Sequence, residues 1–281
     1  MSRIVAGLLL LASLACAQDA RQIVTESQTR ARSKSLEYEG TLEVISSSNQ
    51  STVKRWTFQR IGSFGESKAI LRFTAPPEIK GVALLIVNHR DHASDQWMWT
   101  PAIGRNRPIA LQDRATGLFG TGYSFEDIEE RDVDQFDYKL AGTSAVDGAP
   151  CWKIESRPKG TKTSQYDRSV LSIRKDDYVV VQIENYHEQK LIRTIHSTDI
   201  QKVDGILTPR TIEIEDAARK TRTVLKLEKI RYNLPLKEDV QGNPSGTWTF
   251  VMEAVNSDGS GLTSMTVAPR SRARRGMAAA G

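Results

Sequence analysis

The chain has 281 residues, of which 39% are hydrophobic, 26% are charged and only two are cysteine. This composition is typical of a globular protein and excludes a disordered polyelectrolyte, a collagen-like fibre and a disulfide-stapled miniprotein. The net charge of +5 does not indicate nucleic-acid binding, because Arg3 and the four arginines after Pro269 account for all of it. We therefore expect no nucleic-acid partner.

Residues 1–17 have the pattern of a secretory signal peptide. A positive charge precedes the apolar run 4–14, which is too short to span a hydrocarbon core of about 30 Å. A small-x-small cleavage site follows at residues 15–17. Cleavage there begins the mature chain at Gln18 and predicts a periplasmic protein. The alternative is a lipoprotein that is anchored to the outer membrane through a lipidated Cys16.

The mature chain is predicted to begin with one helix and then to change to strands. Residues 18–33 place apolar and small side chains on one helical stripe, and Asp19 stands at the N-cap position. After them the hydrophobic period becomes two, which is typical of strands. We expect strands at residues 36–44, 53–61, 69–73, 81–87, 97–99, 136–140, 152–154, 170–173, 178–186, 190–195, 206–214 and 221–232.

These segments, about eleven strands at intervals of roughly 8–12 residues, favour a mainly β fold. A parallel α/β fold is excluded because helices are missing between the strands. The spacing is compatible with an antiparallel sandwich, barrel or half-barrel.

Two regions interrupt the strand pattern. Residues 101–130 are irregular and rich in glycine, and we interpret them as a lid or rim, with a short helix that begins at Ser124 and is capped by Asp127. Residues 242–281 form a divergent tail, in which 248–251 could add an edge strand and disorder is expected past Asn256. The domain boundaries are therefore a signal peptide at 1–17, one binding domain at 18–241 and a flexible tail at 242–281.

The chain contains no recognisable catalytic motif. It lacks a nucleophile elbow and a complete dinucleotide-binding loop, so we predict that it is not an enzyme and has no catalytic residue and no cofactor. We interpret Cys151 as a small buried hydrophobe, since it has no disulfide partner once Cys16 is removed. The acidic run 126–130 could supply acid/base carboxylates or calcium ligands, but we interpret it as the solvated face of a helix.

A second polar cluster lies between two expected strands. His89 and His92, together with Asp91 and Asp95, offer ligand types that suit zinc. We interpret them as a polar loop and predict no metal site.

Aromatic and aliphatic residues in the strands are the candidates for ligand binding. Most of them belong to the core, but a single curved sheet with one covering helix cannot fill its own hollow, and the remainder would line a cavity for an acyl chain. The cavity and lid candidates are Trp56, Phe58, Phe73, Leu84, Ile86, Trp97, Trp99, Ile109, Phe119, Tyr123 and Phe125. Arg105 and Arg107 either meet anionic headgroups at the rim or are solvated loop residues.

Three segments in order resemble blocks of LolA-like outer-membrane lipoprotein-sorting proteins. They are TAPPEIKGVALL at 74–85, WMWTPAIGRNRPI at 97–109 and FGTGYSFEDI at 119–128. Later strands match as well, so the resemblance covers roughly residues 37–237 and points to a longer subgroup of the family. Gly122 departs from the pattern, because the family often has Asp there.

The resemblance implies a LolA/LolB-like fold, which is an incomplete antiparallel β-barrel wrapped over an N-terminal helix and a lid segment. The implied function is non-catalytic transport of lipoprotein acyl chains or lipid through the periplasm to the outer membrane. Its partners would be this cargo and possible donor and acceptor complexes at the inner and outer membranes, and the carrier itself would be a monomer. The alternative is an envelope binding module for another hydrophobic ligand or a protein partner.

Overall fold

The structure is a computed structural model that describes residues 19–160, 162–242, 248–253 and 262–267. The signal peptide expected at 1–17 lies outside the described residues. Thirteen antiparallel strands form one sheet in the order β6-β5-β4-β3-β2-β1-β13-β12-β11-β10-β9-β8-β7. The strands are β1 (Ser35–Ile45), β2 (Ser51–Ser63), β3 (Glu66–Ala75), β4 (Ala83–Asn88), β5 (Asp95–Thr100), β6 (Arg105–Pro108), β7 (Phe136–Val146), β8 (Ala149–Pro158), β9 (Arg168–Arg174), β10 (Val180–His187), β11 (Lys190–Val203), β12 (Ile206–Asp216) and β13 (Thr221–Tyr232).

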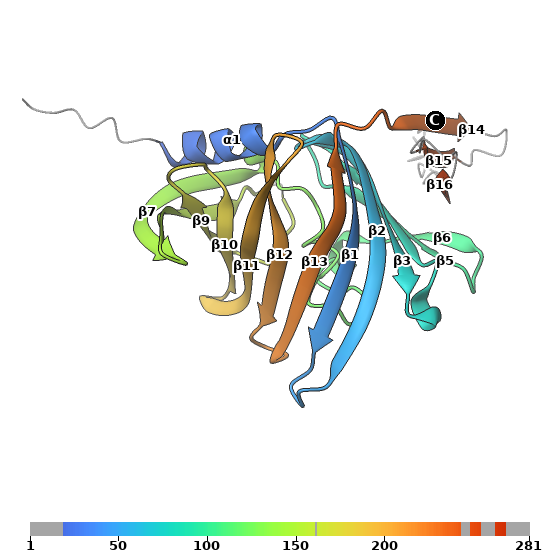
Figure 1. The fold of residues 1–281 in the computed structure, drawn as a ribbon, viewed down its shortest axis with the longest axis horizontal. Coiled ribbons are helices and arrows are strands. Elements are labelled where there is room, and N and C mark those ends of the chain that lie inside the picture. The colour runs from blue at the N-terminus through green and yellow to red at the C-terminus, as the bar shows by residue number, and fades with distance from the viewer. Residues whose placement is uncertain (1–18, 161, 243–247, 254–261, 268–281) are drawn as a thin grey trace, which may run out of the picture.

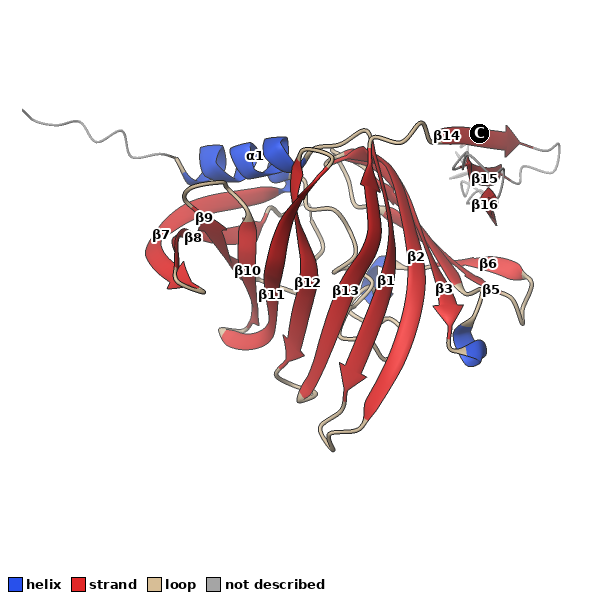
Figure 2. Cartoon of the chain, in the orientation of Figure 1, coloured by secondary structure: helices blue, strands red, loops and turns tan. Residues whose placement is uncertain are grey.

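The sheet is strongly curved but does not close, since β6 and β7 remain as its two edges (Figures 1 and 2). The predicted mainly β class and incomplete antiparallel barrel are confirmed. The expected number of strands was too low. The expected strands did not include the edge strand β6, because its four residues, Arg105–Pro108, show no alternation of apolar and polar side chains. In the described structure β6 pairs with β5.

The predicted first helix is present as α1 (Ala20–Ala31). Asp19 caps it, with its side chain accepting a 3.3 Å hydrogen bond from the backbone N–H of Arg21. Ile23 and Val24 are buried and pack on strand residues such as Leu171. The helix lies against β7 and β12, across one end of the strands in the β7–β12 half of the sheet (Figure 1). No helix in the described part of the chain is long and apolar enough to cross a membrane.

The other half of the hollow is filled by the chain itself. Ile109, Leu118, Tyr123 and Phe125, from the irregular segment after β6, are buried in one cluster with strand residues, among them Trp56. The rings of Trp56 and Tyr123 lie 5.8 Å apart. This half of the sheet therefore encloses a packed core and not an open trough.

Gly122 is tightly packed at the position where the resemblance to LolA-like proteins predicts an aspartate. Its backbone N–H donates a 2.9 Å hydrogen bond to Thr223 Oγ1, and an added Cβ would lie 2.8 Å from that oxygen and 3.2 Å from Ile214 Cγ2. Any side chain here would push the segment off β12 and β13.

We expect Gly122→Ala to lower the free energy of unfolding by about 1–3 kcal/mol, because the site is already filled. Gly160→Ala is the matched control, since no atom lies within 4 Å of its added Cβ. Urea denaturation of both variants measures the difference. If Gly122→Ala and Gly160→Ala were equally stable, the 109–128 segment would tolerate displacement from the sheet.

A separate three-stranded sheet follows, made of β14 (Lys237–Gly242), β15 (Trp248–Glu253) and β16 (Leu262–Val267). The edge strand expected at 248–251 is present as β15, but it pairs with β14 and β16. β16 lies past Asn256, where the sequence predicts disorder, so that prediction is wrong for its six residues. The boundaries of the domain and its tail stay a prediction.

Candidate functional site

A cavity of about 730 Å³ lies beneath α1 and is called the α1 cavity below. Residues of α1 form one wall, the inner faces of β7 and β9–β12 form others, and residues 127–131 contribute to the lining between them. Most of the lining is apolar. Its apolar and aromatic members are Val24, Ala31, Phe64, Tyr138, Leu171, Tyr178, Val179, Val180, Ile183, Leu207 and Pro209. Its volume is in the range of about 300–1,000 Å³ that is usual for small-molecule sites.

The ligand candidates named from the sequence do not line this cavity. The structure brings together Trp56, Phe73, Leu84, Ile86, Ile109, Tyr123 and Phe125 in the main core, with Phe58 and Phe119 packed against it. They pack closely because the 109–128 segment occupies the hollow that they would otherwise line. Their contact with a ligand stays a prediction.

Trp97 and Trp99 lie apart from those residues, on the opposite face of the sheet. Leu84 of β4 is paired with Met98 of β5, and both face the main core, whereas Leu85 is paired with Trp97 and belongs to a separate cluster. The alternation of side chains along a strand causes this separation. The two tryptophans therefore cannot share a cavity with Leu84.

Arg105 and Arg107 are exposed on the edge strand β6 and are absent from the lining of the α1 cavity. Their contact with a lipid headgroup also stays a prediction.

The interpretation of residues 126–130 as a solvated helix face is wrong. Residues 124–130 form no helix, although Ser124 and Asp127 make the reciprocal hydrogen bonds of a capping box. Asp127 Oδ2 accepts a 2.6 Å hydrogen bond from the backbone N–H of Ser124. In return, Ser124 Oγ accepts a 3.3 Å hydrogen bond from the backbone N–H of Asp127. The Asp127 side chain is only 2% exposed and pairs with Arg193, which is 3% exposed and also binds Asp216 at 3.1 Å. Tyr166 donates a 2.8 Å hydrogen bond to Asp127 Oδ1.

The pKa of Tyr166 is raised mainly by burial of its side chain, and the negative charge of Asp127 raises it further. The phenol therefore stays protonated and remains a donor to this carboxylate.

Glu129 and Glu130 are held in the same way. Glu129 Oε1 accepts a 2.5 Å hydrogen bond from Arg114 Nη1, and its other oxygen lies 3.2 Å from Lys162 Nζ. Glu130 forms an ion pair with Arg60. Burial lowers the pKa of Arg60 to about 10. Each acid of the 127–130 segment is therefore neutralised by a buried cation, and these ion pairs fix it between the main core and the α1 cavity.

These buried pairs were missed because no local signal marks them. Arg60, Arg114 and Arg193 are 70, 15 and 66 residues away from their partners. A run of acids looks the same in the sequence whether water or distant arginines surround it.

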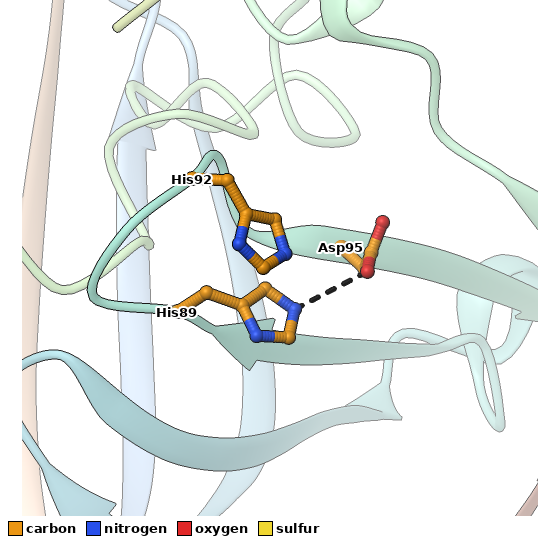
Figure 3. Close-up of side chains that lie close together, drawn as sticks. All are labelled: His89, His92 and Asp95. Atoms are coloured by element: carbon orange, nitrogen blue, oxygen red, sulfur yellow. Dashed lines mark hydrogen bonds and ion pairs between the residues drawn. The ribbon is translucent and has the colours of Figure 1, made fainter. Parts of the chain in front are cut away.

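Three side chains could hold a divalent metal, those of His89 and His92 in the β4–β5 loop and of Asp95 at the start of β5. Ligand atoms of His89, His92 and Asp95 all lie within 4.8 Å of one another, and Figure 3 shows the two imidazoles face to face beside the carboxylate. Their ring centroids are 4.0 Å apart. Each histidine already has a carboxylate neighbour, with His89 Nε2 3.2 Å from Asp95 and His92 Nδ1 2.7 Å from Asp91. The expectation that this cluster holds no metal stays a prediction.

The fold can be placed among known proteins. A family model described as an uncharacterized protein matches residues 65–241, which is more than half of the chain. No curated protein matches the chain by sequence. Among solved structures, a DUF1329 family protein from Desulfovibrio piger is 24% identical with a TM-score of 0.74, over 78% of this chain and 93% of that one.

Two further structures are similar. A protein described as an outer membrane lipoprotein-sorting protein domain from Vibrio parahaemolyticus is 19% identical, with a TM-score of 0.73 over 78% of this chain and 94% of that one. A LolA superfamily protein from Nitrosomonas europaea is 18% identical, with a TM-score of 0.62 over 77% and 94% of the two chains. At these identities the similarity shows the fold, and the predicted LolA-like architecture is confirmed.

Proposed function

The chain belongs to the family of uncharacterized proteins whose model matches residues 65–241, and from this membership and its LolA-like fold we propose that it is a non-catalytic carrier. Its cargo is the acyl portion of a lipoprotein or lipid, which binds in the α1 cavity. The observation that supports this most directly is an apolar cavity of about 730 Å³ in a fold shared with a protein described as lipoprotein-sorting.

The physical reason is the cost of exposing acyl chains to water. Each buried CH₂ group contributes about 0.8 kcal/mol, so a long chain cannot cross an aqueous compartment unless an apolar wall covers it. In this protein Leu171, Val180 and Ile183 provide such a wall on the strands, and Val24 and Ala31 provide it on the helix.

Release of the cargo requires a movable wall, and α1 is suited to that role. It has twelve residues, and an isolated helix of this length is only marginally stable in water. Its polar contacts to the 131–134 segment include a 2.5 Å hydrogen bond from Gln28 Nε2 to the Arg131 carbonyl and an exposed ion pair between Arg21 and Asp134. Residues 127–130, by contrast, are held by buried ion pairs, so we assign the motion to α1.

The proposed location is the periplasm, after export by the signal peptide at residues 1–17. A donor at the inner membrane and an acceptor at the outer membrane would complete the route, with the carrier acting as a monomer. The proposal includes no covalent step, because it requires only that the cargo enter and leave the cavity.

Native mass spectrometry of the protein, purified without detergent from the periplasm of its own host, tests the proposal. We expect a bound triacylated peptide or a lipid, and saturable binding of an acyl fluorophore after the ligand is removed. A protein that carries no apolar ligand and binds no acyl probe would contradict it. A sterol-like or glycolipid mass would favour the second candidate, an envelope binding module for another hydrophobic ligand.

A further inference from the structure

One half-buried cation of the α1 cavity has no counter-ion among the described residues. Every carboxylate that lines the cavity forms an ion pair. The pairs of Asp127, Glu129 and Glu130 are described above, and Asp177 pairs with Arg174. Of the lining cations, Arg30 pairs with Glu26 at 2.6 Å. Within the described part of the chain, Arg131 and the exposed Lys202 are lining cations for which no ion pair with a carboxylate is found.

Arg131 is half-buried, and its hydrogen bonds are long. Its Nη1 lies 3.3 Å from Ser169 Oγ and its Nη2 lies 3.4 Å from Ser156 Oγ, while its Cζ stands 4.3 Å over the ring of Phe136. A guanidinium has five N–H donors, so these contacts leave most of its hydrogen-bonding capacity unused. The face of an aromatic ring holds the group in place without neutralising its charge.

In the part of the chain that the structure describes, no ion pair is found between Arg131 and its neighbouring acids Glu130 and Asp132. Glu130 is engaged by Arg60, and Asp132 Oδ1 accepts a 2.7 Å hydrogen bond from the backbone N–H of Asp134. Tyr138 lines the same cavity, and burial raises its pKa to about 12, with Arg131 acting in the opposite direction. Tyr138 is therefore a neutral hydroxyl donor beside the cation.

A partly buried cation with free donors and apolar surroundings is best satisfied by an anion that carries an apolar chain. We propose that Arg131 is the headgroup anchor of the α1 cavity, and that the cargo is an anionic amphiphile. Its carboxylate or phosphate binds the guanidinium in the forked geometry that arginine favours. Its acyl chain lies against Leu171, Val180 and Ile183. This inference rests on the proposed function and defines its cargo class, since a neutral acyl cargo would leave the charge of Arg131 uncompensated.

The test compares ligands that share one chain and differ in headgroup. The full-length protein is first loaded with a neutral apolar fluorophore. Dodecanoate, dodecyl phosphate and dodecanol are then added in separate titrations, and displacement of the fluorophore measures their binding. A further titration with inorganic phosphate tests the anion without an acyl chain. We expect both anionic amphiphiles to bind at least about tenfold more tightly than dodecanol, which is the range of a hydrogen-bonded charge. Inorganic phosphate alone should bind far more weakly than dodecyl phosphate, because it gains nothing from the apolar wall.

The variant Arg131→Gln should lose this preference and bind all three amphiphiles as the wild type binds dodecanol, whereas Arg131→Lys should keep part of it. Arg157→Gln is the matched control, because Arg157 is an exposed cation that follows Ser156 on β8 and does not line the cavity. Thermal unfolding checks that each variant is folded.

The possible failures are distinguishable. If the wild type binds dodecanol as tightly as dodecanoate, or if Arg131→Gln weakens all three amphiphiles equally, Arg131 is not a headgroup anchor although the cavity still binds chains. If the wild type binds none of the amphiphiles, the carrier function itself is wrong. If inorganic phosphate binds as tightly as dodecyl phosphate, the site recognises a free anion and the cargo assignment is overturned.

Discussion

Replacing Arg193 with methionine is expected to lower the free energy of unfolding by about 3–5 kcal/mol. Arg193 lies between two buried carboxylates, those of Asp127 and Asp216, and its side chain is only 3% exposed. Methionine fills a similar space but leaves both negative charges in a site that excludes water. Urea denaturation followed by tryptophan fluorescence measures the loss.

The same arrangement predicts an asymmetry between the partners. Asp127→Asn removes one of two carboxylates and leaves the pair of Arg193 and Asp216 intact, so its cost should be smaller, about 1.5–3 kcal/mol for the weakened charged hydrogen bonds. Arg222→Gln is the control for a solvent-exposed pair, because Arg222 is 48% exposed opposite Glu213, and it should cost about 0–1 kcal/mol.

If Arg193→Met and Arg222→Gln were equally stable at neutral pH, the buried ion pairs would not hold residues 127–130 in place.

Filling the α1 cavity from the helix side is expected to abolish binding of an acyl probe. Ser27 lies on the inner face of α1, is 8% exposed and lines the cavity. Ser27→Trp places an indole in space that the cargo would occupy. Because the indole buries apolar surface in an existing hollow, the thermal midpoint should stay the same or rise while binding is lost.

The control is Gln22→Trp, which adds the same side chain to an exposed position of the same helix. It should bind the probe as the wild type does. Fluorescence titration of both variants gives the comparison. Unchanged binding by Ser27→Trp would place the ligand site outside the α1 cavity and would favour the main core around Trp56 instead.

Much of the secondary structure was predictable because its signals are local. The helix follows from the N-cap residue Asp19 and the apolar stripe that includes Ile23, and the strands follow from the alternation of apolar and polar residues. The edge strand β6 escaped notice because an exposed strand of polar residues carries no alternation. The opposite orientations of Leu84 and Leu85 were predictable as well, because successive side chains of any strand point to opposite faces of the sheet.

The sequence by itself determined the strands and one amphipathic helix, since hydrophobic periodicity is a property of neighbouring residues, but it left a sandwich, a barrel and a half-barrel open. Only the tertiary structure decided which part of the hollow is filled and which part is open. That outcome depends on distant segments: residues 109–128 pack against Trp56, whereas α1 lies over β7 and β12 and leaves a cavity beneath it. For the same reason the acids at 127–130 became buried ion pairs, because their partner arginines come from elsewhere in the chain.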